Sequence, residues 1–282
     1  MRRREFLAVP VAVGGLMALS SADAASSDPA PVRSNSLGVK ALVFDVFGTV
    51  VDWRGSIIRE GAQWGKDKGL DIDWGKFADE WRAGYAPSMD KVRNGEMPWT
   101  KLDVLHRMIL EDLLQQYNIV GLAEEEKDHW NRVWHRLTPW PDAVEGLTRI
   151  KKKFVIATLS NGNVSLLVDM AKHAGLPWDT VFSAELFQHY KPDPEAYQGA
   201  VELLSCKPAE VMMVAAHPLD LKAAQSCGLK AGLVPRPLEH GPAHSATAAK
   251  SAAPAMASAA ASANATFDIT ARNFIELAAK LA

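Results

Sequence analysis

The chain has 282 residues, of which 48% are hydrophobic and 23% are charged, and its formal net charge at pH 7 is −2. A globular chain of this length can bury a core without disulfides or metal ions, and it fits one large domain or two smaller ones. Because the net charge is close to zero, no basic field indicates nucleic acid or an anionic membrane as a partner.

Residues 1–24 predict an export signal. Three arginines near the start precede a short apolar run, which ends in the small residues of a cleavage site at positions 22–24. The Arg-Arg-x-Phe-Leu pattern at residues 3–7 resembles a twin-arginine signal, and an ordinary secretion signal or an uncleaved anchor is the alternative. We expect cleavage after Ala24, a periplasmic protein without stable membrane insertion, and a flexible leader over residues 25–37.

Four short apolar runs rich in β-branched residues predict buried parallel strands. They cover residues 39–47, 154–159, 211–216 and 231–234. Helical patterns alternate with these runs, over residues 164–174, 194–204 and 220–227. This alternation predicts an α/β fold with a Rossmann-like parallel sheet and helices on both faces, whose active site lies at the carboxyl ends of the strands.

The segment after the first strand differs from the rest of the chain. Residues 53–152 show helical patterns without a clear strand, over residues 57–68, 74–85, 101–117 and 124–136. We interpret this segment as a helical cap domain inserted into the α/β core, which we place at residues 38–52 and 153–282.

Two further features of the carboxyl-terminal half carry no assigned chemistry. Residues 243–265 consist almost entirely of Ala, Ser and Thr, so we predict a mobile surface insertion before a final helix over residues 271–281. Cys206 and Cys227 either pair in an oxidising compartment or stay separate thiols, and their spacing does not resemble a metal site.

Polar side chains stand where the predicted strands end. Asp45 follows the first strand and precedes a turn at Gly48, so its carboxylate is either a nucleophile in the crevice or the cap of the next helix. Ser160 and Asn161 follow the second strand, where they either bind an anionic group or cap a helix.

The next two polar positions could complete a site around the Asp45 carboxylate. Lys191 precedes Pro192, so it either places a fixed cation beside Asp45 or is a solvated surface residue. Asp220 follows the third strand and could cap a helix, orient Lys191 or act as a base.

In chain order, these four motifs resemble those of the haloacid dehalogenase superfamily: a nucleophilic aspartate, a serine or threonine, a lysine and an acidic loop. The resemblance covers about residues 37–240 and 266–282. It implies a Rossmann-like core, an inserted cap, and Asp45 as the nucleophile.

Within that superfamily, the position two residues after the nucleophile separates two reactions. Phosphatases carry there a second aspartate that protonates the leaving alcohol, whereas this chain has Phe47, which cannot transfer a proton. Asp45 and Asp220 alone form a thin ligand set for Mg²⁺, so we expect no metal and no other cofactor. A halide leaving group needs no proton.

The details are similar to the L-2-haloacid dehalogenase subgroup. Phe47, Ser-Asn-Gly at residues 160–162 and Lys-Pro-Asp-Pro-x-x-Tyr at residues 191–197 match that subgroup. Arg82 resembles the cap arginine that meets the departing halide and the substrate carboxylate, or is a surface helix residue. The resemblance implies a small 2-halo acid as partner, is compatible with a homodimer, and assigns substrate binding to Phe47, Thr49, Arg82, Asn161 and Tyr197.

The resemblance also implies a covalent mechanism. Asp45 attacks C2 of the substrate, Ser160 helps to hold the substrate carboxylate, and Lys191 keeps Asp45 ionised. Water, activated by Asp220 or by His217, then hydrolyses the aspartyl ester to a 2-hydroxy acid of inverted configuration. The alternatives are a Mg²⁺-dependent phosphatase and an exported binding protein that has lost turnover.

The loop after the third strand departs from the subgroup. Ala215 and His217 stand where its best-known members have serine and asparagine. His217 either takes over their role around the hydrolytic water or is structural.

Overall fold

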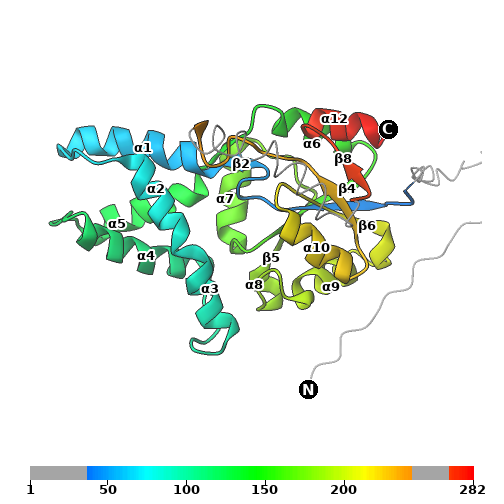
Figure 1. Ribbon diagram of the computed structural model, residues 1–282, viewed down its shortest axis with the longest axis horizontal. Coiled ribbons are helices and arrows are strands. Elements are labelled where there is room, and N and C mark those ends of the chain that lie inside the picture. The colour runs from blue at the N-terminus through cyan, green and yellow to red at the C-terminus, as the bar shows by residue number, and fades with distance from the viewer. Residues whose placement is uncertain (1–36, 243–266) are drawn as a thin grey trace, which may run out of the picture. The chain divides into compact units, whose positions relative to one another are not determined.

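The computed structural model describes residues 37–242 and 267–282. In this part of the chain, the core is a sheet with strand order β5-β4-β1-β6-β7-β8, in which all neighbouring strands are parallel (Figure 1). The strands are β1 (Ala41–Phe44), β4 (Val155–Ser160), β5 (Thr180–Ser183), β6 (Val211–Ala215), β7 (Lys230–Leu233) and β8 (Ile269–Thr270). The α/β fold class is therefore confirmed. The four expected strands correspond to β1, β4, β6 and β7, whereas β5 and β8 were not expected.

Helices cover both faces of the sheet because successive side chains of each strand point to opposite sides. In β1, Leu42 and Phe44 belong to one buried cluster and Val43 belongs to the other. The first face packs against α6 (Ala143–Lys151), α7 (Val164–Ala174) and α12 (Phe274–Lys280). The second packs against α9 (Pro194–Leu203) and α10 (Pro218–Ser226), and the short helices α8 (Ala184–Phe187) and η2 (Pro208–Glu210) complete the core.

The cap helices lie between β1 and β4 in the sequence and form their own layer beside the sheet (Figure 1). They are α1 (Trp53–Lys68), α2 (Trp74–Ala83), α3 (Tyr85–Arg93), α4 (Leu102–Gln116), α5 (Glu124–Asn131) and η1 (Arg132–His135). Asp52 and Asp73 cap α1 and α2, because each carboxylate accepts a backbone N–H of the first turn. Stacked tryptophans fill the interior of the cap, and the rings of Trp64 and Trp130 lie 5.2 Å apart.

Three expectations about the cap segment need correction. The helix expected over residues 74–85 ends at Ala83, because Pro87 has no backbone N–H to donate to the Ala83 carbonyl, and the unexpected helix α3 follows Gly84. A short antiparallel pair, β2 (Val51–Asp52) and β3 (Thr138–Pro139), joins the two ends of the segment. Finally, the expected cap segment, residues 53–152, includes α6. That helix packs on α12 and β4, so it belongs to the core.

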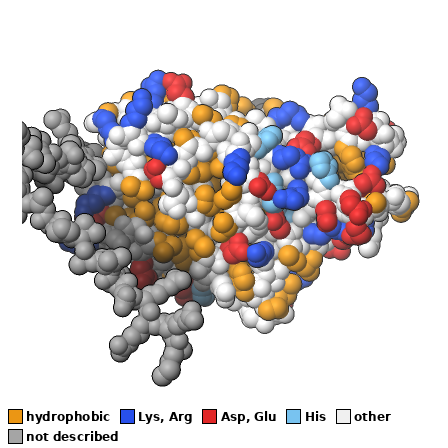
Figure 2. All heavy atoms as spheres, turned by 180° about the vertical axis from the view of Figure 1, so that it is seen from behind, with side chains coloured by type: hydrophobic (Ala, Val, Ile, Leu, Met, Phe, Trp, Pro, Cys, Tyr) orange, Lys and Arg blue, Asp and Glu red, His pale blue; other side chains and the backbone are white. Residues whose placement is uncertain are grey.

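Other expectations concern the export signal, the insertion and the two cysteines. The export signal over residues 1–24 and the insertion over 243–265 lie outside the described residues, as does most of the leader. Among the described helices, none is long and apolar enough to cross a membrane. Cys206 and Cys227 are both free thiols. On the face shown in Figure 2, acidic and basic side chains of the described residues are interspersed, in keeping with the small net charge.

Candidate active site

A cavity of about 370 Å³ opens at the carboxyl edge of the sheet, where the core meets α2 and α3. The core contributes Asp45, Phe47, Asn161, Lys191, Pro192, Tyr197, His217, Leu219 and Asp220, and the cap contributes Arg82, Tyr85, Ala86 and Met89. Eight of the ten site residues expected from the sequence thus line one cavity; Thr49 and Ser160 do not. Parallel strands bring residues that are distant in the sequence to the same edge.

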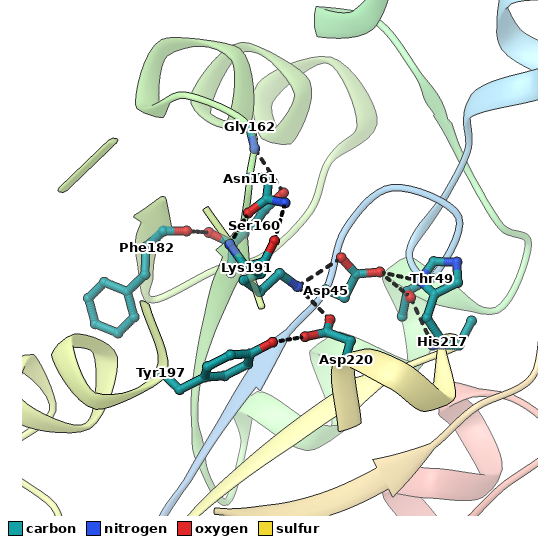
Figure 3. Close-up of polar contacts among 12 residues, drawn as sticks. Asp45, Thr49, Ser160, Asn161, Gly162, Phe182, Lys191, Tyr197, His217 and Asp220 are labelled. Atoms are coloured by element: carbon teal, nitrogen blue, oxygen red, sulfur yellow. Dashed lines mark hydrogen bonds and ion pairs between the residues drawn. The ribbon is translucent and has the colours of Figure 1, made fainter. Parts of the chain in front are cut away.

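Asp45 is held in a fixed orientation directly after β1. Its backbone N–H donates to the carbonyl of Val214 at 3.0 Å, so the β1–β6 ladder extends to the site residue. Its Oδ1 accepts from Lys191 Nζ at 3.1 Å, and its Oδ2 accepts from Thr49 Oγ1 at 2.6 Å (Figure 3). Burial alone would raise the pKa of Asp45, but the Lys191 charge and hydrogen bonds from His217 and Thr49 hold that pKa well below its usual range. The carboxylate is therefore ionised and available as a nucleophile.

Lys191 is a buried cation shared by two carboxylates. Its side chain reaches Asp45 and also contacts Asp220 Oδ2 at 2.5 Å, and only 8% of the residue is exposed. Burial would lower the pKa of Lys191, yet Asp220 and Asp45 raise it above the ordinary lysine value. The Asn161 side chain fixes the lysine backbone, because its Oδ1 accepts from Lys191 N at 2.7 Å and its Nδ2 donates to Lys191 O at 3.2 Å. Asn161 thus positions the lysine as well as lining the cavity.

Asp220 uses both carboxylate oxygens inside the site. Its Oδ2 accepts from Lys191, and its Oδ1 accepts from the Tyr197 hydroxyl at 2.6 Å (Figure 3). Burial raises the pKa of Asp220. The Lys191 charge opposes this rise, whereas repulsion from the nearby Asp45 carboxylate adds to it. The Tyr197 hydroxyl is therefore directed at Asp220, although the ring borders the cavity as expected.

Thr49 and Ser160 lie behind the cavity wall. Thr49 is fully buried, and its hydroxyl donates to Asp45 Oδ2 while accepting from Ala216 N at 2.9 Å. Ser160 is 1% exposed, and its hydroxyl accepts from Gly162 N at 3.2 Å. The expected roles in binding substrate do not fit this placement. Thr49 instead orients the Asp45 carboxylate, and Ser160 shapes the turn after β4.

A carboxylate that the sequence reasoning missed, Glu239, completes a chain from Asp45. His217 Nδ1 lies 3.0 Å from Asp45 Oδ2, and His217 Nε2 lies 2.9 Å from Glu239 Oε2. Glu239 is 6% exposed and also accepts from Trp53 Nε1 at 3.1 Å. Gly48 makes room for it, since a Cβ there would lie 2.0 Å from Glu239 Oε1. The only sequence signal was its place in the loop after β7, at the edge of the sheet where sites form.

The His217 ring is charged in this arrangement. Carboxylates only accept hydrogen bonds, so both ring nitrogens must donate. Burial would lower the pKa of His217, but its hydrogen bonds to Asp45 and Glu239 raise it to about 10. Burial would raise the pKa of Glu239, which the imidazolium instead holds below its usual range.

The cap contributes a cation and aromatic rings to the cavity. The Arg82 guanidinium lies 4.1 Å from the centre of the Tyr85 ring, and its buried Nη1 has no hydrogen-bond partner among the described residues. An unpaired guanidinium N–H beside a cavity is suited to an anionic group. The Phe47 ring meets Trp134 edge-on at 5.9 Å, and His106 stacks on Trp134 at 4.2 Å. These rings make the wall around Phe47 apolar.

The site does not fit a magnesium ion. No group of three histidine, cysteine or acidic side chains in the described part of the chain could hold a metal. Mg²⁺ prefers several oxygen ligands, which here would have to include Asp45 and Asp220. The ammonium of Lys191 already lies between these two carboxylates and would repel a second cation.

Known proteins share this architecture. Residues 39–228 match a family model described as haloacid dehalogenase-like hydrolase. The (S)-2-haloacid dehalogenase 4A of Burkholderia cepacia is 28% identical over 203 residues, which cover 67% of this chain and 80% of that protein. The (S)-2-haloacid dehalogenase of Xanthobacter autotrophicus is 29% identical over 221 residues, covering 70% and 76%. The crystal structure of the defluorinating L-2-haloacid dehalogenase Rha0230 has a TM-score of 0.78 and 42% identity, covering 88% of this chain and 98% of that one.

Proposed function

The chain belongs to the haloacid dehalogenase-like hydrolases, and from this membership we propose that it hydrolyses the carbon–halogen bond of short (S)-2-haloalkanoic acids. The observation that carries the proposal is Phe47. It stands two residues after Asp45 at the cavity wall, where it cannot protonate a leaving group. A halide leaves without a proton, whereas the alcohol of a phosphate ester needs one. The names of the related (S)-2-haloacid dehalogenases support the same reaction.

The cavity suits a small organic anion. Its volume of about 370 Å³ lies at the lower end of the range of small-molecule sites. The unpaired Nη1 of Arg82 gives a charged donor for the substrate carboxylate or the departing halide. Because Lys191 already contacts both Asp45 and Asp220, we assign it to stabilising the nucleophile and assign substrate binding to Arg82.

The first chemical step follows from the contacts of Asp45. Its Oδ2 is held by Thr49 and His217, whereas its Oδ1 has the single contact with Lys191. One carboxylate oxygen attacks C2 from the side opposite the halogen, so the carbon–halogen bond breaks and an aspartyl ester forms. Water then attacks the carbonyl carbon of the ester, which releases a 2-hydroxy acid of inverted configuration and restores Asp45.

The two alternatives find less support. In a Mg²⁺-dependent phosphatase the metal would have to bind Asp45 beside the ammonium of Lys191, which lies 3.1 Å from that carboxylate and repels a second cation. A binding protein without turnover has no need of an aspartate whose pKa is held far below its usual range by a buried lysine. Ionisation and orientation of Asp45 both favour catalysis.

The test is halide release from (S)-2-chloropropionate by the purified protein, with and without EDTA. We expect one chloride and one (R)-lactate per substrate, no effect of EDTA, and no reaction with the Asp45→Asn variant or the (R)-enantiomer. Hydrolysis of p-nitrophenyl phosphate that depends on Mg²⁺, without any halide release, would replace this proposal by the phosphatase. Tight binding of the haloacid without turnover would favour the binding protein.

A further inference from the structure

His217 lies between two carboxylates at the edge of the cavity. Its Nδ1 faces the Oδ2 of Asp45 and its Nε2 faces Glu239, and the ring also borders the cavity. Glu239 is itself fixed by the indole N–H of Trp53 at the start of α1. A buried carboxylate that holds the far nitrogen of a histidine fixes the ring orientation and decides which nitrogen carries the proton. The near nitrogen, Nδ1, is then the one that can exchange a proton at the site.

We propose that His217 is the general base that activates the hydrolytic water, and that Glu239 is the residue that positions it. This inference rests on the proposed function, since it concerns hydrolysis of the ester formed on Asp45. The geometry favours His217 over Asp220 as the base. The printed contacts of Asp220 run to Lys191 and Tyr197, and it is linked to Asp45 through that lysine, whereas the Nδ1 of His217 lies 3.0 Å from Oδ2 of the carboxylate that becomes the ester.

Formation of the ester would switch His217 from an acid to a base. In the free enzyme the imidazolium is stabilised by Asp45 and Glu239 together. Once Asp45 is esterified it carries no charge, so His217 loses one of its two anionic partners and its pKa falls. The ring then releases its Nδ1 proton to solvent and keeps the Nε2 proton, which is donated to Glu239. The Nδ1 proton released to solvent is the proton that the overall hydrolysis of the carbon–halogen bond produces.

During hydrolysis of the ester, Nδ1 of His217 carries each proton that moves within the site. Neutral His217 takes a proton from water at Nδ1 while the water oxygen bonds to the carbonyl carbon of Asp45. The bond between that carbon and the substrate oxygen breaks, and the leaving oxygen takes the proton back from Nδ1, which gives the 2-hydroxy acid. The carboxylic acid left on Asp45 passes its own proton to Nδ1, and the ion pair of the free enzyme is restored.

The charged groups around His217 fit this cycle. Asp45 and Glu239 touch the ring directly, and Lys191 and Asp220 lie on the other side of Asp45. His240 lies near Glu239 and holds the pKa of that carboxyl down by its charge. Alkylation of Asp45 leaves Lys191 paired with Asp220, so the main charge lost near His217 is that of Asp45.

The experiment separates the two half-reactions in the purified protein. Enzyme in excess over (S)-2-chloropropionate is quenched at intervals, and chloride release and the intact protein mass are measured together. In Glu239→Gln we expect chloride release within a few-fold of the wild-type rate, while the ester persists and its hydrolysis slows on the order of 10²-fold or more. The matched control is Asp103→Asn, because Asp103 contacts His135, a histidine that likewise lies between two carboxylates, but does not line the cavity. The control should hydrolyse its ester at nearly the wild-type rate.

The pH profile of ester hydrolysis distinguishes positioning from a structural role. Loss of the Glu239 carboxylate destabilises the imidazolium, so the rate in Glu239→Gln should rise with pH around a lower midpoint than in the wild type. A uniform loss of rate at an unchanged midpoint would overturn the proposal, as would a hydrolysis rate equal to that of the wild type.

A second variant keeps the test decisive if Glu239→Gln does not fold. His217→Gln should also release one chloride per enzyme and trap the ester, and the double variant should be no slower than His217→Gln alone. An ester that is trapped only by Asp220→Asn would show that Asp220 is the base. If the wild-type protein releases no chloride at all, the proposed function fails first and this inference fails with it.

Discussion

The Thr49 hydroxyl should act on the nucleophile and not on the substrate, which Thr49→Val tests with little change in shape. The substitution removes a donor to the ionised Asp45 and leaves the N–H of Ala216 buried without an acceptor. Each of these losses costs about 1–3 kcal/mol, so we expect the free energy of unfolding to fall by roughly 3 kcal/mol in total. For a chain of this size that lowers the Tm by roughly 6–12 °C.

The kinetic consequence separates the two possible roles of Thr49. Misorientation of the Asp45 carboxylate should lower kcat by roughly 10- to 100-fold, while KM for 2-chloropropionate stays nearly constant because the hydroxyl does not line the cavity. Thr49→Ser keeps the hydroxyl and serves as the control, with kcat close to that of the wild type. A raised KM with an unchanged kcat in Thr49→Val would refute this reasoning and restore Thr49 as a substrate-binding residue.

Two other substitutions test the electrostatics of the buried site. Lys191→Met should lower kcat on the order of 10²-fold or more. It should also move the acid limb of the kcat/KM profile to higher pH, because Asp45 loses the cation that lowers its pKa. An acid limb at an unchanged pH would contradict the role of the lysine. Burial lowers the pKa of His106 from 6.5 to about 3, so the unfolded chain binds a proton that the folded chain does not, and stability is lost as the pH falls from 6.5 toward 3. His106→Phe keeps a ring against Trp134. Between pH 7.5 and pH 5, its free energy of unfolding in urea should fall by less than that of the wild type. Equal falls in the two proteins would speak against a buried neutral histidine.

The fold could be predicted where the chain has strong periodicity. The apolar run of β6 has no other stable location than the centre of a sheet, and α7 shows a full amphipathic pattern, so both were found with nearly correct bounds. By contrast, β5 has only two apolar residues, Val181 and Phe182, between Thr180 and Ser183, and β8 holds two residues, so neither gives an apolar run. The break between α2 and α3 lies at Gly84 and Pro87, two local helix-breaking residues that the apolar pattern over residues 74–85 outweighed.

The site shows the same division between local and distant information. Asp45, Lys191 and Asp220 each follow a local strand or loop signal, and the structure joins them through the lysine. The role of Thr49 depends on the direction of one hydroxyl, which residue type alone does not give. Glu239 lies 186 residues from Trp53 and 22 residues from His217, so the folded backbone is needed to bring these groups together.

Covalent catalysis through Asp45 is the central claim, and a single turnover in ¹⁸O-labelled water tests it most directly. With enzyme in excess over (S)-2-chloropropionate, water attacks the carbonyl carbon of the ester, so the label should enter the Asp45 carboxylate. The lactate from that first turnover should carry unlabelled oxygen at C2. Mass spectrometry of the peptide that contains Asp45, together with that of the lactate, reads both outcomes. Label found first in the lactate, with none in the peptide, would show that water attacks the substrate directly and would contradict the account.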